Sequence, residues 1–202
     1  MKKFLTLLLL AVFSLSASAE FRWGPTAGVN FNNFYWKQPL LESSMSTGFQ
    51  AGIMGEIMIP GIGFGIDMAA RYNMHGASVN LGDHYVWSVD GYENQTLRLH
   101  ALDIPVHLRF KWTRMDGFEK YVAPFAFVGP VFSFNLSQSK CDAIEHPAGS
   151  IGVEFGIGGE FIEHIQLAVS YQLGATYDLR TVKLDNLSAR SSSWNINIAY
   201  LF

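Results

Sequence analysis

Three histidines stand close to hydroxyl and carboxylate residues in one stretch of the chain. The stretch holds His75, His84 and His100 together with Ser78, Asp83 and Asp90. Such a set suggests acyl transfer, in which a base must lie within hydrogen-bond reach of a hydroxyl nucleophile. The spacing matches no catalytic motif, and it is not diagnostic of a metal site either. We therefore expect ordinary loop polarity, with no enzyme activity, cofactor or metal, and keep a loop His/Ser/Asp enzyme as the more distant alternative.

A second set of polar residues places charges at alternating positions. Its members are Arg22, Glu56, Asp67, Arg71, Asp103, His107, Arg109, Lys111, Glu154 and Glu160. If their segments are neighbouring strands, these side chains share one face and can form cross-strand ion pairs. One interpretation is a gated pore or proton path. We favour a charge network that plugs a narrow barrel, in which Asp103 would pair with Arg109 or Lys111.

Alternation of apolar and polar residues defines the elements that would position these charges. In the last stretch, Trp194, Ile196, Ile198, Tyr200 and Phe202 share one face of a strand, opposite amide and small residues. Similar alternation predicts strands at about 21–32, 47–59, 62–74, 97–112, 120–135, 149–161, 164–175 and 194–202. The fifth strand is apolar on both faces, and its Pro124 and Pro130 predict bulges.

This pattern predicts an all-β fold, an eight-stranded antiparallel up-and-down transmembrane β-barrel with apolar residues toward lipid. A soluble barrel of lipocalin type also alternates, but its water-facing side would carry many Lys and Glu residues. Here the polar positions are mainly Gly, Asn, Gln, Ser and Ala. The predicted connections alternate between long (33–46, 75–96, 136–148, 176–191) and short (60–61, 113–119, 162–163), as outer loops and periplasmic turns do.

The first 19 residues have the features of a cleavable signal peptide. Lys2 and Lys3 precede an apolar run, and Ala17-Ser18-Ala19 is a cleavage pattern. We therefore expect a signal peptide over 1–19 and a barrel domain over 20–202. Removing Lys2 and Lys3 from the 14 basic residues leaves 12 against 17 acidic ones, a net charge of −5 that argues against nucleic acid as a partner. The single Cys141 cannot form an internal disulfide.

Residues 99–112, LHALDIPVHLRFKW, resemble a strand of the PorT-like family of small Bacteroidetes outer-membrane barrels. In that family an acidic or small residue precedes Ile-Pro and alternating apolar positions, as at Asp103-Ile104-Pro105. The pairs Pro124-Phe125 and Gly129-Pro130, the signal peptide and the final Tyr200-Leu201-Phe202 are also similar to that family. The resemblance implies the bacterial outer membrane and leaves the molecular role open.

The longest predicted connection, 75–96, holds the residues most suited to binding a partner, namely Asp83, His84, Tyr85, Trp87 and Tyr92. Aromatic side chains are enriched where proteins bind partners, and loops on rigid scaffolds often carry function. We expect a structural or partner-binding barrel with a closed lumen, acting through such loops on an envelope or extracellular protein or glycan. A small pore is the alternative. Membrane lipids and the barrel-assembly machinery, through the C-terminal strand, are the other expected partners.

Overall fold

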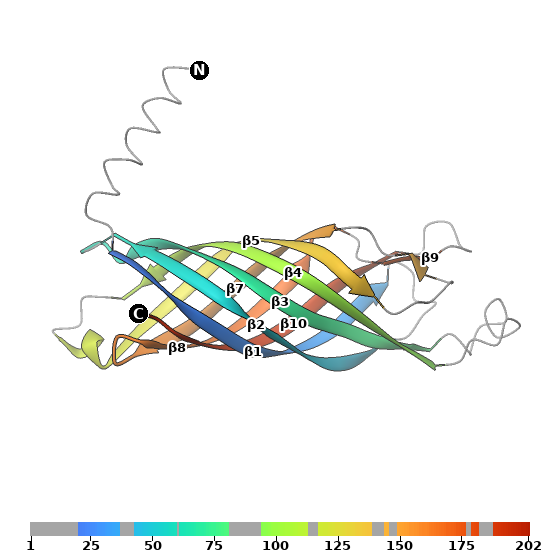
Figure 1. Cartoon of the computed structure of the whole chain (residues 1–202), viewed down its shortest axis with the longest axis horizontal. Helices are drawn as coiled ribbons and strands as arrows, with labels where there is room; N and C mark the ends of the chain where they lie inside the picture. The colour runs from blue at the N-terminus through green and yellow to red at the C-terminus, as the bar shows by residue number, and fades with distance from the viewer. Residues whose placement is uncertain are drawn as a thin grey trace, which may run out of the picture.

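The computed structural model describes residues 20–36, 43–59, 61–80, 94–112, 117–138, 144–145, 149–176, 179–181 and 188–202. Within these ranges, eight long antiparallel strands form a closed barrel (Figure 1). They are β1 (Glu20–Trp36), β2 (Ser43–Met58), β3 (Phe64–Asn80), β4 (Asn94–Lys111), β5 (Val122–Gln138), β7 (Gly149–Phe161), β8 (Ile165–Gly174) and β10 (Ser188–Tyr200). Each strand pairs with the next, and β1 pairs with β10 to close the sheet. The predicted eight-stranded up-and-down barrel is confirmed.

Three short elements complete the described fold. The strands β6 (Ile144–Glu145) and β9 (Leu179–Thr181) pair with each other, and β9 extends the ladder of β10. A 3-10 helix, η1 (Phe118–Lys120), precedes β5. The start of β1, the C-terminus and η1 lie at one end of the barrel, and β9 lies at the other (Figure 1).

At the end of the barrel opposite the chain termini, several strands are longer than predicted. β1 continues to Trp36, β3 continues to Asn80, and β4 already begins at Asn94. The predicted connections 33–46 and 75–96 are therefore too long. In these extensions the sequence no longer shows the apolar and polar pattern from which the strands were predicted, but the backbone ladder continues.

Prolines interrupt the sheet differently from the prediction. No register shift occurs at Pro124 or Pro130 on the β7 side of β5, so the predicted bulges are wrong there. The pairing of β4 with β5 instead has a gap. It extends to Pro105↔Val131, is absent at the next two positions, and resumes at Leu108↔Val128. Proline has no N–H to donate to a ladder, which accounts for a local interruption without an inserted residue. The one shift recorded between β4 and β5 lies between His100 and Ala101.

The two faces of the barrel wall have opposite character. Outward side chains are apolar and exposed, as shown by Ile157 at 70% exposure, whereas the inward Glu56 and Glu154 are fully buried. A water-soluble barrel would show the reverse arrangement, with its apolar residues inside. The predicted assignment of faces is thus confirmed, wherever side chains are described, on the seven long strands for which alternation predicted one; for β5, apolar on both faces, no assignment was predicted.

The connection between β7 and β8 is a tight turn with an unusual backbone. Ile162 and Glu163 have φ angles of 52° and 61°, a left-handed conformation that is costly for residues with a Cβ. Neighbouring chain segments hold the turn in place. Arg22 Nη1 donates to the Glu163 carbonyl at 2.6 Å, and the Leu201 N–H donates to the His164 carbonyl at 2.8 Å.

Candidate functional site: the polar lumen

The structure brings the ten predicted charged residues together inside the barrel. Arg22 comes from β1, Glu56 from β2, and the others from β3, β4 and β7. Nine of them are buried, and Arg22, nearest the terminal end, is partly exposed. Their positions follow from strand alternation, because each occupies an inward-facing place in its strand.

Glu56 is the centre of the cluster nearest the chain termini. Its Oε1 accepts hydrogen bonds from Arg22 Nη2 at 2.7 Å and Lys111 Nζ at 2.5 Å, and its Oε2 accepts one from Arg109 Nη1 at 2.5 Å. Glu160 joins this cluster by accepting from Arg22 and Lys111 at 2.8 and 2.7 Å. Charge-assisted hydrogen bonds of this kind are the stronger ones in proteins, so this end of the lumen is tightly cross-linked.

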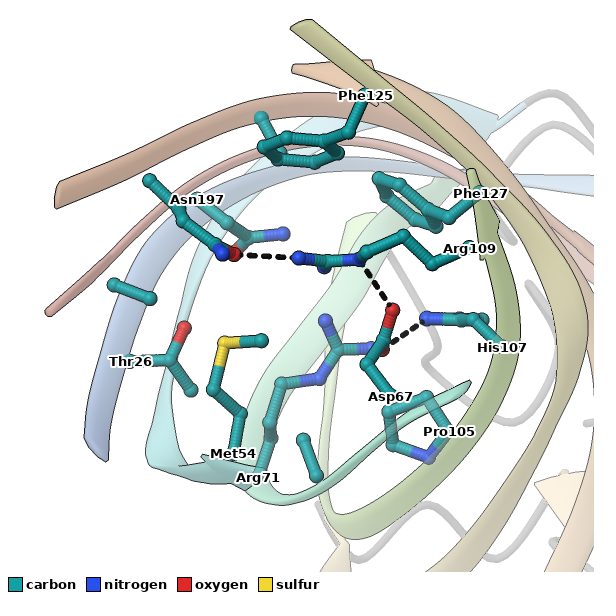
Figure 2. A pocket seen from close by; sticks show the side chains of 14 residues that line it. Thr26, Met54, Asp67, Arg71, Pro105, His107, Arg109, Phe125, Phe127 and Asn197 are labelled. Carbon is teal, nitrogen blue, oxygen red and sulfur yellow. Dashed lines mark hydrogen bonds and ion pairs between the residues drawn. The ribbon is translucent and has the colours of Figure 1, made fainter. Parts of the chain in front are cut away.

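A second cluster lies deeper in the barrel. Asp67 accepts from Arg109 Nε at 2.8 Å and contacts His107 Nδ1 at 2.9 Å (Figure 2). Glu154 accepts from Arg71 Nη2 at 2.7 Å and lies 3.4 Å from His107 Nε2. Since Arg109 bonds both Asp67 and Glu56, the two clusters form one continuous network.

Amides replace charges toward the far end of the lumen. Asp103 accepts from Asn73 Nδ2 at 2.6 Å, and Asn73 in turn accepts from Asn30 at 2.8 Å. The prediction that Asp103 pairs with Arg109 or Lys111 is wrong. These cations lie further along β4, beside Glu56, whereas Asp103 stands opposite Arg71 in the β3–β4 register. Asp103 Oδ1 and Arg71 Nε are buried without a hydrogen-bond partner in the described structure.

Sequence reasoning missed two uncharged members of the network. Gln166 donates to Glu56 Oε2 at 3.0 Å and to Glu160 Oε2 at 2.6 Å, while its own Oε1 accepts from Arg109 at 2.6 Å. Ser170 donates to Glu154 at 2.6 Å. Both occupy the polar face of β8 assigned from alternation, but their specific contacts depend on strands far apart in the sequence.

Two inward phenylalanines of β5 were also missed, because this strand is apolar on both faces. The Arg109 guanidinium lies 4.3 Å from the centre of the Phe125 ring, and the His107 ring lies 4.8 Å from that of Phe127. Figure 2 shows both rings beside Arg109. Contact of a cation with an aromatic face is favourable, so these rings pack against the network as well as fill the lumen.

The glycines of β7 make room for these rings. A Cβ added to Gly158 would lie 2.4 Å from Phe125 Cζ and 2.5 Å from the Leu167 carbonyl oxygen. We expect Gly158→Ala to destabilise the barrel by about 1–3 kcal/mol, because over-packing forces side chains and backbone to move. Gly159→Ala is the matched control, since its Cβ would meet the nearest atom at 3.4 Å. Urea unfolding in lipid vesicles measures both, and equal costs would contradict the packing argument.

Little empty space remains between the charged clusters. A cavity of about 40 Å³ lies beside Asp67, Arg71, His107 and Arg109 (Figure 2). A buried water needs on the order of 10–15 Å³ by this measure, so the cavity has room for two or three waters. This volume is small compared with the ligand sites of about 300–1,000 Å³ typical of proteins.

Two of the three histidines suggested for acyl transfer, His75 and His100, do not share a face. His75 pairs with Leu99 and points inward, whereas the adjacent Met74↔His100 pair points outward. His100 Nδ1 instead makes a 2.5 Å hydrogen bond with the Tyr72 hydroxyl on the outer surface. Alternation along neighbouring strands separates the two rings across the barrel wall. In the part of the chain that the structure describes, no group of three His, Cys, Asp or Glu residues could hold a metal ion.

Several predicted positions lie outside the described residues. They are the signal peptide, Cys141, and the loop residues Asp83, His84, Tyr85, Trp87, Asp90 and Tyr92. Among the residues that are described, no helix is long and apolar enough to cross a membrane.

The family model for the outer membrane protein beta-barrel domain matches residues 13–176. The chain belongs to this family. The outer membrane protein OprG from Pseudomonas aeruginosa has a similar structure, with 12% identity and a TM-score of 0.55 over 91% of this chain and 95% of that one. Ail of Yersinia pestis, in complex with a heparin analogue, has 13% identity and a TM-score of 0.48 over 91% and 99%. No curated protein sequence matches.

Membership of this family places the chain in the bacterial outer membrane. The exposed apolar surface therefore contacts the lipid chains of the bilayer. Aromatic residues pack on one another at two levels of this surface. Trp23 packs on Phe202 at 5.6 Å near the chain termini, and Tyr171 packs on Trp194 at 4.8 Å further along the strands. Exposed aromatic residues are typical of the outer surface of outer-membrane barrels.

Proposed function

We propose that this outer-membrane barrel has a closed lumen and a structural or partner-binding role, rather than that of a pore. The observation that carries the proposal is the continuous network from Arg22 through Glu56, Arg109 and Asp67 to His107, together with the small size, about 40 Å³, of the cavity beside it. Paired charges and the Phe125 ring occupy the path that ions would need. An eight-stranded barrel is just wide enough to be filled in this way.

Planar bilayers test the closed lumen. We expect purified protein to give no steady conductance, because ions would have to displace buried, paired charges. Lys111→Met is the companion variant, since it removes one positive charge from the lumen. Stable channels in the wild type whose ion selectivity changes in Lys111→Met would overturn the proposal. Channels with the same selectivity in both proteins would show that a contaminating porin conducts the current, and the proposal of a closed barrel would stand.

Short turns of outer-membrane barrels face the periplasm, so we orient the chain termini inward and the extended ends of the strands toward the exterior. In this orientation the segment 81–93 is an outer loop. We propose that Asp83, His84, Tyr85, Trp87 and Tyr92 contact an extracellular or envelope protein or glycan. Aromatic residues on a rigid scaffold suit such a role.

Replacing 81–93 with a short Gly-Ser linker tests the loop. β3 ends at Asn80 and β4 begins at Asn94, so the described strands are untouched and the barrel should still assemble. We expect at least one protein that co-purifies from native membranes to be lost. The same replacement of 37–42, between β1 and β2, is the control at the same end of the barrel. An unchanged set of co-purifying proteins would remove the 81–93 loop as the binding site.

A non-enzymatic role is also a proposal, supported by the separation of His75 and His100 onto opposite faces. Two finer assignments rest on sequence features. We propose that the strand ending in Trp194, Ile196, Ile198, Tyr200 and Phe202 is recognised by the barrel-assembly machinery. The resemblance to PorT-like barrels of Bacteroidetes supports a place in that group.

A further inference from the structure

The turn between β7 and β8 holds two side chains in a backbone conformation that suits glycine. Ile162 and Glu163 have φ angles of 52° and 61°, whereas every other positive φ angle in the described part of the chain belongs to a glycine. The His164 N–H donates to the Phe161 carbonyl at 3.2 Å, so the loop has two residues. Two-residue hairpin loops with positive φ at both positions favour Asn-Gly, and a β-branched residue is an outlier there. A hairpin of β7 and β8 alone would therefore close this turn poorly.

Both ends of the chain supply contacts that hold the turn. Arg22 of β1 donates from Nη1 to the Glu163 carbonyl at 2.6 Å. Leu201, which follows β10, donates its N–H to the His164 carbonyl at 2.8 Å, and its own carbonyl lies 2.9 Å from His164 Nδ1. The His164 ring stacks on Tyr200 of β10, with ring centres 5.6 Å apart. The C-terminus and the β8 end of the turn lie at the same end of the barrel (Figure 1).

One of these contacts depends on the closed barrel. Leu201 can reach the turn as soon as β10 pairs with β8, whereas β1 and β10 are the outer strands of the sheet until they pair with each other. An open sheet would therefore separate Arg22 from the Glu163 carbonyl. We propose that Arg22 couples the β7–β8 turn to barrel closure, so that this unfavourable turn is fully ordered only when β1 has paired with β10.

Amide hydrogen exchange of the folded barrel in dodecylphosphocholine micelles, followed by NMR, tests this coupling. The Ile162 N–H donates to the Tyr121 carbonyl at 3.1 Å and reports opening of the turn. The Phe202 N–H donates to the Trp23 carbonyl of β1 at 2.9 Å and reports separation of the two chain ends. We expect one shared opening, with protection factors of the two amides within about threefold of each other. Protection of the Ile162 amide that is more than about tenfold lower would show that the turn opens independently and would overturn the proposal.

Variants of the turn and of Arg22 separate the two possible roles of this arginine. Arg22→Lys keeps a positive charge for Glu56 and Glu160 but loses the second guanidinium nitrogen, which reaches the turn. It should lower protection at position 162 by about tenfold in the natural turn. The double substitution Ile162→Asn with Glu163→Gly supplies the favoured residues, and there Arg22→Lys should lower protection by less than about threefold. Equal losses in both turns would show that Arg22 acts through its ion pairs alone and would overturn the proposal.

The turn between β2 and β3 provides the control within the same spectra. Its Ile62 N–H donates to the Ile59 carbonyl at 3.4 Å, and its positive φ angles fall on Gly61 and Gly63. Because glycine adopts this conformation readily, the turn needs no help from the chain ends, and its exchange should not change in Arg22→Lys. A matching loss of protection at Ile62 would show general loosening of the barrel and would contradict a specific coupling. Folding of each variant is checked by the heat-dependent migration of the barrel in gels.

Discussion

Replacing Glu56 with Ala is expected to destabilise the barrel by about 3–5 kcal/mol, as the loss of one partner from a buried ion pair does. Glu56 is fully buried and contacts three cations, Arg22, Arg109 and Lys111. Without its carboxylate, Glu160 would be the nearest acid to Lys111 and Arg22, and Asp67 the nearest to Arg109. The remaining positive charges would be left partly uncompensated away from water.

Reversible urea unfolding in lipid vesicles measures this cost. Glu20→Ala is the control, since its carboxylate is mostly exposed and lies 3.9 Å from the same Arg22. Exposed pairs contribute about 0–1 kcal/mol, so the control should be close to the wild type. A Glu56→Ala variant that unfolds within about 1 kcal/mol of the wild type would contradict the role of Glu56 as the centre of the network.

The second large effect concerns the lipid-facing surface. Ile198→Lys is expected to cost about 2–4 kcal/mol, because a cation in the middle of the bilayer loses its hydration. Ile198 faces outward at 52% exposure and stands opposite Leu167 of β8 and Ala27 of β1. The same urea titration in vesicles reports the cost.

Ile62→Lys provides a control with the same chemical change and a similar exposure of 57%. Ile62 lies in the turn between β2 and β3, outside the membrane-spanning strands. The penalty should fall to about 0–1 kcal/mol there, because it depends on depth. Equal penalties at both positions would contradict the assignment of the outward face to lipid.

Alternation predicted the strands and faces well because it reports directly which side of the wall each residue occupies. It placed Glu56, Arg109 and Glu154 in the lumen before any contact was known. It failed where that signal is absent. Both faces of β5 are apolar, so Phe125 and Phe127 gave no sign that they turn inward, and the strand extensions toward Trp36 and Asn80 carry little alternation.

The sequence could not predict which inward-facing side chains contact one another, and the reason is geometric. Strand tilt and register decide which inward residues meet, and Asp103 and Arg109 on the same strand are too far apart along it to pair. Gln166 reaches Glu56 from a position 110 residues away in the sequence. Alternation identifies the face of such a residue but does not give its height in the barrel.

The pairing of β1 with β10 also dictates when the lumen can form. Thr26 Oγ1 donates to the Ile198 carbonyl at 3.2 Å across a sequence separation of 172 residues. Until that seam joins, the sheet has two open edges, and the charges of β1 to β4 would face hydrocarbon if the sheet entered the bilayer. Joining such distant segments has a loop-closure cost and is intrinsically slow. Insertion into the membrane and pairing of β1 with β10 must therefore proceed together, because only this pairing closes the barrel and keeps the lumen charges away from lipid.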